Sequence, residues 1–262
     1  MRRNIYRILV LLFSLLTIIS TKNVFSYYSE SSDQKERYEN LVQLTQERVC
    51  EQRDEDIIAE TYTAPDGLSI LPEYERLYQI NNDIVGWIQI EGTEINYPVM
   101  QSIHSPNYYL KHGFDKAYTD YGCPYIDEAC DMVRPSDNLF LYGHNMRDGS
   151  MFADLEKYKR KDFWTNHATI LFDTLYAKQT YVVVAAFKTT VNTGSPSDFA
   201  YYQFIDADSS EQFDEFISYI KKHAFYETGV TAEYGDQLIT LSTCEYSNTN
   251  GRMVVVAKRV RD

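Results

Sequence analysis

Three residues of this 262-residue chain have the types and positions that nucleophilic catalysis by a thiol requires. Cys244 ends the strand-like run Leu238–Thr243 and is followed at once by polar residues, so we expect its thiol at the rim of a sheet. Arg252 follows an Asn-Gly turn signal and begins the next apolar run. If the two runs pair in antiparallel fashion, Arg252 returns to the side of Cys244. His144 follows a third apolar run, Asn138–Tyr142, after one glycine.

This trio suits acyl transfer through a covalent thioester. The thiolate attacks a carbonyl carbon, the imidazole handles the protons, and the guanidinium holds the negative charge that develops on the carbonyl oxygen. Each residue also has an ordinary explanation: a buried structural thiol, a surface arginine or a loop histidine. The three together are more specific than any one alone. The remaining histidines lie in polar or helical surroundings and are interpreted as solvated or loop residues: His104, His112, His167 and His223.

The apolar patterns predict a mainly β domain with a few helices. A β-hairpin is expected over residues 85–90 and 94–99. Further strands are expected at residues 124–126, 139–142, 169–172, 181–189, 237–242 and 253–259. Helices are expected at residues 72–79, 151–158, 161–166 and 209–223. Many strands with irregular connections favour a β-barrel or a sandwich with helical decoration.

The first 28 residues differ from the rest of the chain. Arg2, Arg3 and Arg7 flank the uncharged apolar run Ile8–Ile19, and a basic flank of this kind is typical of an export signal. The run reaches the roughly 20 residues of a membrane span if it continues to residue 23. We expect a retained signal-anchor over residues 1–28, with cleavage after Ser26 as the alternative. Either way, the remainder is extracytoplasmic.

Residues 29–60 are charged, with apolar side chains at roughly helical spacing, and predict a helix that leads from the membrane to the domain. Pro65-Asp66-Gly67 is a turn signal. Residues 29–70 are therefore interpreted as a helical linker, and residues 71–262 as one catalytic domain.

Charge and cysteine content exclude several classes. The chain has a net charge of −13, and all the charged residues among its first 28 are basic, so the remainder is more acidic still. That surface argues against nucleic acid as a partner. The spacing of cysteines and histidines fits no zinc pattern, and no metal or cofactor is expected. Cys123 and Cys130 could pair, whereas Cys50 is interpreted as a small hydrophobic residue.

The chain resembles a sortase and, within the sortases, class B. The resemblance covers about residues 75–261 and includes the helix at 209–223, which points to class B. It implies an eight-stranded closed β-barrel with N-terminal helices and an extra helix between the late strands. The motifs that carry it are Leu141-Tyr142-Gly143-His144-Asn145, Thr240-Leu241-Ser242-Thr243-Cys244, and Arg252 with the Val-Val-Val-Ala-Lys tail that ends at Lys258.

The resemblance implies a transpeptidase of Gram-positive bacteria, held in the cell membrane by a single N-terminal pass with its catalytic domain outside. Cys244 would cleave the sorting signal of a surface protein after its threonine, and an amine of a peptidoglycan precursor or of a pilin lysine would resolve the thioacyl enzyme. His144 would be the acid and base, and Arg252 would bind the oxyanion, with the backbone N–H of Glu245 as a second donor. The resemblance also implies five residues in the peptide groove: Leu110, Tyr142, Ser242, Thr243 and Glu245.

Among these activities, anchoring to the cell wall is favoured over pilin polymerisation. A papain-like protease has its cysteine before its histidine, which is the opposite chain order. An L,D-transpeptidase would show a glycine before the thiol, where this chain has Thr243. The alternative of another class is an anchored binding module with an incidental cysteine, for which Cys244→Ala would leave function intact.

Overall fold

The structure is a computed structural model that describes residues 2–54, 64, 67–191 and 199–261. Met1–Leu41 and Val42–Asp262 form two compact units. The end of the predicted linker helix, residues 55–60, and most of the predicted turn, residues 65–66, lie outside the described residues.

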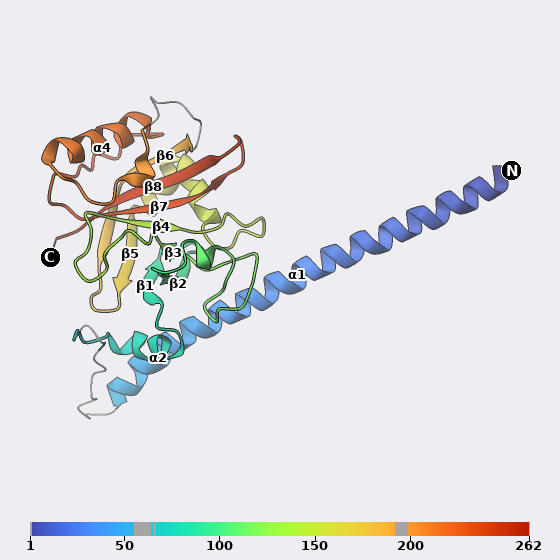
Figure 1. Ribbon diagram of the computed structural model, residues 1–262, viewed down its shortest axis with the longest axis horizontal. Coiled ribbons are helices and arrows are strands. Elements are labelled where there is room, and N and C mark those ends of the chain that lie inside the picture. Colours follow the sequence, from blue (N-terminus) through green and yellow to red (C-terminus); the bar gives the residue numbers. More distant parts are fainter. Residues whose placement is uncertain (1, 55–63, 65–66, 192–198, 262) are drawn as a thin grey trace. The chain divides into compact units, whose positions relative to one another are not determined.

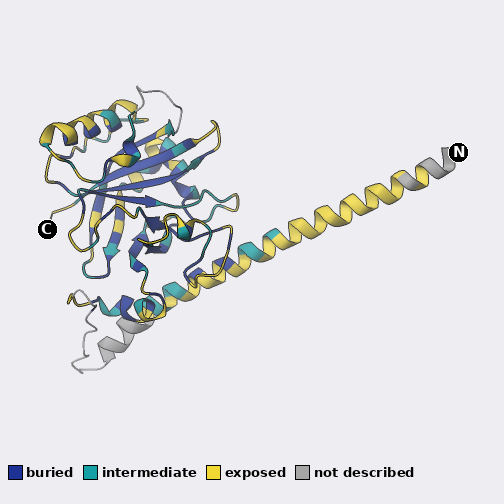
Figure 2. Ribbon diagram, in the orientation of Figure 1, coloured by how far each residue is buried: buried dark blue, intermediate teal, exposed yellow. Residues whose placement is uncertain are grey.

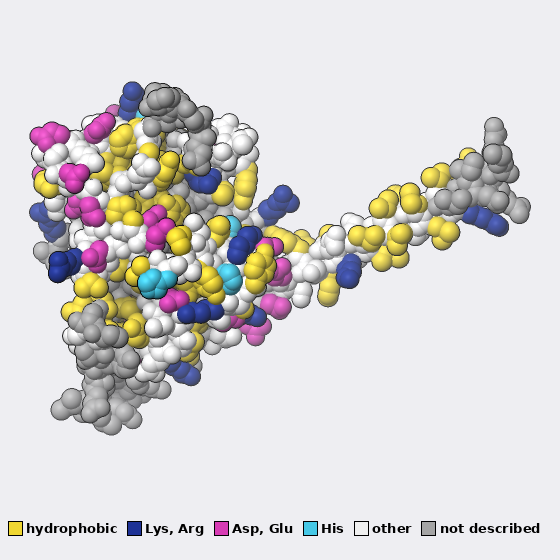
Figure 3. Space-filling model, in the orientation of Figure 1, with side chains coloured by type: hydrophobic (Ala, Val, Ile, Leu, Met, Phe, Trp, Pro, Cys, Tyr) yellow, Lys and Arg dark blue, Asp and Glu magenta, His cyan; other side chains and the backbone are white. Residues whose placement is uncertain are grey.

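Helix α1 (Arg2–Asp54) is continuous and joins the apolar N-terminal run to the charged stretch that follows it. It contains one candidate membrane-spanning segment, Leu9–Gln46, by length and composition. Apolar side chains such as Leu11 and Phe13 are largely exposed (70% and 73%), so this is not the buried core helix of a soluble fold. Figure 2 shows the exposed run along α1, and Figure 3 shows the hydrophobic side chains on it.

The second unit is built around a closed barrel with the strand order β1-β2-β3-β4-β7-β8-β6-β5 (Figure 1). Closure gives each of these strands a neighbour on both sides. The eight-stranded barrel confirms the fold that the family resemblance implied. Its strands are β1 (Ile84–Gln89), β2 (Asn96–Met100), β3 (Tyr125–Ile126), β4 (Asn138–Tyr142), β5 (Thr169–Thr174), β6 (Thr180–Thr190), β7 (Leu238–Glu245) and β8 (Gly251–Arg259).

Short helices decorate the barrel, and α4 packs on β6. Ser209 caps α4 by accepting a hydrogen bond from the backbone of Gln212, and an apolar face follows at helical spacing. The segment predicted as a helix at 151–158 is a 3-10 helix, and two further 3-10 turns were not predicted. The helices are α2 (Pro72–Ile80), η1 (Tyr108–Leu110), η2 (Ala153–Lys159), α3 (Lys161–Asn166), η3 (Tyr201–Gln203) and α4 (Ser210–His223).

The two cysteines that could have paired are separate. Both thiols are buried, and no disulfide joins Cys123 to Cys130. The thiol of Cys123 contacts the carbonyl of Pro98, and that of Cys130 contacts the carbonyl of Asn138, each at 3.6 Å. Each thiol is therefore packed as a small buried group that donates a weak hydrogen bond to a separate backbone carbonyl.

Strands β4 and β7 are parallel neighbours in strict register. Asn138 pairs with Leu238, and the pairing continues in step to Tyr142 with Ser242, so each partner lies one hundred positions further along the chain. A parallel pair needs a long crossover connection, and here β5, β6, α4 and the short helices between them provide it. Residues just beyond Tyr142 and Ser242 therefore leave the sheet next to each other.

A buried hydrogen-bond network holds this register. Asn138 is fully buried, and its amide nitrogen donates to the carbonyl of Phe204 at 2.8 Å. Its amide oxygen accepts from the hydroxyl of Thr240 on β7, also at 2.8 Å. A shift of one residue would break the bond to β7 and leave buried polar groups unpaired, which costs free energy.

We predict that Asn138→Leu destabilises the barrel strongly. The substitution leaves the hydroxyl of Thr240 and the carbonyl of Phe204 buried without partners, at about 1–3 kcal/mol each, so the free energy of unfolding should fall by about 2–6 kcal/mol. Urea unfolding followed by circular dichroism measures this. The double variant Asn138→Leu/Thr240→Val removes one of the stranded groups and should recover part of the loss. An unchanged unfolding midpoint in Asn138→Leu would show that the network does not hold the register.

Candidate active site

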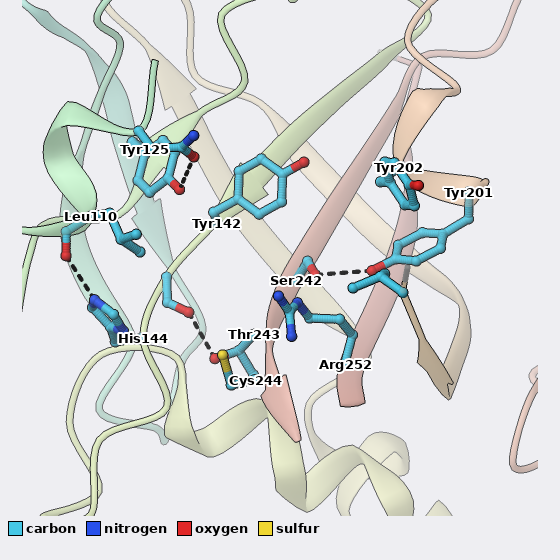
Figure 4. A pocket seen from close by; sticks show the side chains of 13 residues that line it. Leu110, Tyr125, Tyr142, His144, Tyr201, Tyr202, Ser242, Thr243, Cys244 and Arg252 are labelled. Carbon is cyan, nitrogen blue, oxygen red and sulfur yellow. Dashed lines mark hydrogen bonds between the residues drawn. The ribbon is translucent and has the colours of Figure 1, made fainter. Parts of the chain in front are cut away.

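Cys244, Arg252 and His144 come together at one end of the barrel. Cys244 on β7 pairs directly with Arg252 on β8, as the antiparallel pairing expected from the sequence required. Directly paired residues share one face of a sheet. His144 lies two residues beyond Tyr142, and Cys244 lies two residues beyond Ser242, the partner of Tyr142. Figure 4 shows Cys244 between His144 and Arg252.

The sequence had suggested that Cys244 comes just after the strand, whereas the structure places it inside β7. The ladder to β8 continues for one more pair, Glu245 with Gly251. The polar residues after Cys244 therefore form a tight turn, residues 246–250, between two strands. The β7–β8 ladder therefore holds the backbone of Cys244 in the sheet, which limits the conformational freedom of the thiol.

The segment that carries His144 is fastened to the end of β7. The hydroxyl of Thr243 donates to the carbonyl of Gly143 at 2.7 Å. The amide nitrogen of Asn145 donates to the carbonyl of Cys244 at 2.8 Å. These two bonds lie on either side of His144 in the chain, so the position of the imidazole follows that of the thiol.

Gly143 is required by close packing. A Cβ atom added at this position would lie 2.6 Å from the ring of Phe152, well inside contact distance. The backbone N–H of Phe152 also donates to the carbonyl of His144 at 2.8 Å. The glycine therefore lets the His144 segment lie flat on a buried aromatic ring.

His144 is half-buried, and its Nε2 atom lies 2.7 Å from the carbonyl oxygen of Leu110. A carbonyl only accepts, so Nε2 carries a proton in this arrangement and Nδ1 remains for proton exchange. Burial lowers the pKa of His144, and Lys111 lowers it further, while the carbonyl bond and Asp120 act in the opposite sense. The net lowering favours neutral imidazole at pH 7.

Arg252 is half-buried, and one of its terminal nitrogens, Nη1, donates to the carbonyl of Gly251 at 2.9 Å. A guanidinium has five N–H donors in a fixed plane. Among the described residues that line the pocket, Arg252 is the only lysine or arginine. It therefore provides the permanent positive charge of this site.

The three residues line a pocket of about 370 Å³. Four of the five groove residues expected from the sequence also line it: Leu110, Tyr142, Ser242 and Thr243. The lining is rich in aromatic rings and, within the described residues, contains no carboxylate. It therefore suits an uncharged peptide segment in extended form.

Glu245 is the exception, because it is not among the lining residues. Its side chain is 5% exposed, and its carboxylate binds the ammonium of Lys159 at 2.8 Å and the hydroxyl of Ser247 at 2.6 Å. Lys159, followed by Ser247, lowers the pKa of Glu245 to about 2. The expectation that this side chain contacts a peptide is therefore corrected, since the carboxylate is already bound within the protein.

Apart from Gly143, which belongs to the His144 motif, sequence reasoning missed the rest of the lining: Asn107, Tyr125, Val191, Tyr201 and Tyr202. Asn107 has a left-handed backbone (φ 58°) before η1, and its amide oxygen accepts from the hydroxyl of Tyr125 at 2.7 Å. The hydroxyl of Tyr201 on η3 lies 3.3 Å from that of Ser242. Three-residue 3-10 turns have no sequence period, and these rings do not stand out among 23 tyrosines.

The comparisons with known proteins agree with this geometry. Residues 88–260 match the family model of the sortase domain. Sortase B of Staphylococcus aureus (strain NCTC 8325 / PS 47) is 31% identical over 263 residues, which cover 100% of this chain and 98% of that protein. The chain is also similar to a solved Staphylococcus aureus sortase B–substrate complex, with a TM-score of 0.75 and 31% identity over 88% of this chain and 98% of that one.

A solved sortase B complexed with triglycine is similar as well, with a TM-score of 0.73 and 31% identity over 88% of this chain and 99% of that one. Sequence and structure thus agree over most of the chain. The protein belongs to the sortase family, as a class B sortase, and is a cysteine transpeptidase.

Proposed function

We propose that this sortase cleaves the C-terminal sorting signal of surface proteins after a threonine and joins them to an amine of the cell wall. The observation that carries the proposal is the direct pairing of Cys244 with Arg252 at a pocket that His144 also lines. The similar structures described as a substrate complex and a triglycine complex support it, since triglycine is a peptide with a free amine.

In the first step, the imidazole of His144 takes the proton of the Cys244 thiol, and the resulting thiolate attacks the carbonyl carbon of the threonine. The C–N bond to the following residue breaks, and the protonated imidazole of His144 gives its proton to the leaving amine. The result is a thioester on Cys244 and a released C-terminal fragment. In the second step, the acceptor amine attacks the thioester, the imidazole takes its proton, and the thiolate leaves as a new peptide bond forms.

Arg252 stabilises both tetrahedral intermediates. It shares a sheet face with Cys244, so its guanidinium is near the carbonyl oxygen on which negative charge develops. Its bond to the carbonyl of Gly251 pre-orients the planar group at little further entropic cost. The backbone N–H of Glu245 is the second donor in this proposal.

The pocket holds the residues that precede the threonine. Leu110 and Tyr142 provide apolar and aromatic walls on the side of β4, and Ser242 with Thr243 provides the floor on β7. The hydroxyl of Tyr142 donates to the carboxylate of Asp127 at 3.1 Å, which fixes the ring against the pocket. An extended peptide backbone would lie on these walls, and its scissile bond would lie over Cys244.

The N-terminal helix anchors the enzyme in this proposal. α1 contains the candidate span, and the basic residues that precede it favour a cytoplasmic N-terminus. The catalytic domain, residues 71–262, then lies outside the cell, where surface proteins and peptidoglycan precursors meet. Thiol chemistry in that setting needs no cofactor.

The test of this function is the intact mass of a soluble fragment that starts near Ser29, incubated with peptides that contain Asn-Pro-Gln-Thr-Asn, Ser-Pro-Lys-Thr-Gly or Leu-Pro-x-Thr-Gly. We expect a mass increase equal to the N-terminal part of one peptide, because the thioester retains that part. Cys244→Ala should stay folded and give no adduct. If no peptide gives an adduct with a folded fragment whose Cys244 also resists alkylation, the binding-module alternative takes precedence.

We predict that Arg252→Ala lowers kcat/KM by roughly 100-fold or more, the loss typical of removing an oxyanion donor. Arg252→Lys should recover only part, since an ammonium lacks the planar fork. Arg259→Ala is the matched control, because Arg259 lies on the same strand and bonds Gln237 at the other end. A folded Arg252→Ala enzyme with near-normal kcat/KM would remove this residue from the mechanism.

We predict that His144→Ala impairs both steps, because the same imidazole gives and takes the proton. Single-turnover acylation and transfer from a preformed thioester to triglycine measure the steps separately. His223→Ala, an exposed histidine on α4, should leave both rates unchanged. Normal transfer from the thioester in His144→Ala would restrict the imidazole to the first step.

A further inference from the structure

We propose that Lys159 is a positioning residue of this enzyme: through Glu245, it holds the turn between β7 and β8 so that Cys244 and Arg252 stay opposite each other. The inference rests on the roles proposed above for those two residues. Lys159 ends η2, a different part of the chain, and does not line the pocket.

The contacts form a chain from Lys159 into the turn. The ammonium of Lys159 binds one carboxylate oxygen of Glu245 at 2.8 Å. The other carboxylate oxygen accepts from the backbone N–H of Ser247 at 3.1 Å and from its hydroxyl at 2.6 Å. Glu245 directly follows Cys244 and pairs with Gly251, which directly precedes Arg252. The carboxylate thus holds the turn that connects the two residues.

Close packing leaves the turn little room. A Cβ atom added at Gly251 would lie 2.4 Å from the backbone oxygen of Glu245 and 3.1 Å from its carboxylate. The carboxylate is therefore folded under the turn, where its side chain is 5% exposed. A charge so placed needs its cation, because burying an unpaired carboxylate is strongly unfavourable.

Lys159 also binds Glu156 of the same 3-10 helix, but the two carboxylates differ in exposure. The side chain of Glu156 is 30% exposed, although one of its carboxylate oxygens is buried without a hydrogen-bond partner among the described residues. The side chain of Glu245 is only 5% exposed, so it is the less hydrated of the two carboxylates. Removing Lys159 is therefore expected to destabilise mainly the β7–β8 turn. A displacement of about 1 Å in the reacting groups that this turn connects is enough to lower the rate by roughly 100-fold.

The chain provides a matched control two residues away. Lys157, on the same 3-10 helix, pairs with Asp154 at 2.8 Å, and the side chain of Asp154 is 7% exposed. Asp154 accepts from the backbone N–H of Glu94, so it holds the turn between β1 and β2. Lys157→Met and Lys159→Met thus remove the same charge from buried carboxylates that hold different turns.

The experiment compares kcat/KM for the Asn-Pro-Gln-Thr-Asn peptide, or for whichever panel peptide acylates the wild type, with stability measured by urea unfolding. We expect Lys159→Met to lose roughly 100-fold in kcat/KM, the cost of a displaced reacting group, and Lys157→Met to stay near the wild type. Lys159→Arg should keep most activity. Lys159→Met/Glu245→Gln should restore it, because the amide still accepts from Ser247 and is neutral.

A pH profile distinguishes this mechanism from general destabilisation. Glu245 is bonded to Lys159 of η2 and to Ser247 of the turn. Glu156 shares the ammonium of Lys159, and Lys188 of β6 donates to the hydroxyl of Ser247 at 3.3 Å. Lys159 is the first cause of the low pKa of Glu245, so the pKa rises when the lysine is lost. Protonation then neutralises the buried group, and the activity of Lys159→Met relative to wild type should increase as pH falls.

Equal effects of Lys159→Met and Lys157→Met on kcat/KM, or no restoration in the double variant, would overturn the proposal. Amide hydrogen exchange gives a readout independent of activity: the amides of residues 247–251 should exchange faster in Lys159→Met and not in Lys157→Met. If the wild type acylates no peptide, the proposed function fails. Unchanged exchange in both variants then overturns the turn-holding role as well.

Discussion

The active site depends on the parallel pairing of β4 with β7. These strands are far apart in sequence, and their register, Asn138 with Leu238 through Tyr142 with Ser242, determines which residues leave the sheet together. At one end, the amide of Asn138 is bonded to Thr240, and at the other the hydroxyl of Thr243 is bonded to the carbonyl of Gly143. His144 and Cys244 each lie two residues beyond the last pair, Tyr142 with Ser242. Their separation of one hundred residues is therefore the same as that of the paired residues.

A second, antiparallel constraint completes the site. The β7–β8 ladder sets Arg252 opposite Cys244, and the buried carboxylate of Glu245 lies at the turn that joins them. One parallel and one antiparallel pairing thus meet on β7, and each brings one group to the thiol. The pocket walls follow from the same elements and from two 3-10 turns, η1 and η3, which contribute Leu110, Tyr201 and Tyr202. The carboxylate of Glu245 is not among the lining residues, and no other carboxylate is found in the described lining beside the guanidinium of Arg252.

Much of this arrangement could be predicted from the sequence, and the exceptions have physical causes. Long apolar runs with clear periods, such as β6, β8 and α4, were located closely, and the polar segment after Cys244 marked it as the candidate nucleophile. The pairing of β4 with β7 cannot be derived from periodicity, because strand partners across such a distance leave no local pattern. The walls on η1 and η3 were missed because turns of three residues have no period. Glu245 was misplaced because sequence does not reveal that Lys159, from a distant segment, binds its carboxylate.

The crossover between β4 and β7 also has a consequence for when activity first arises. Non-local contacts form late, since the entropy of closing a long loop must be overcome before they stabilise the chain. His144 and Cys244 become neighbours only when the crossover that contains β5, β6 and α4 has been closed by the pairing of β4 with β7. A partly folded chain has Cys244 but lacks the neighbouring imidazole of His144. The three groups thus come together only in the completed barrel, and acyl transfer that uses all of them requires the folded domain.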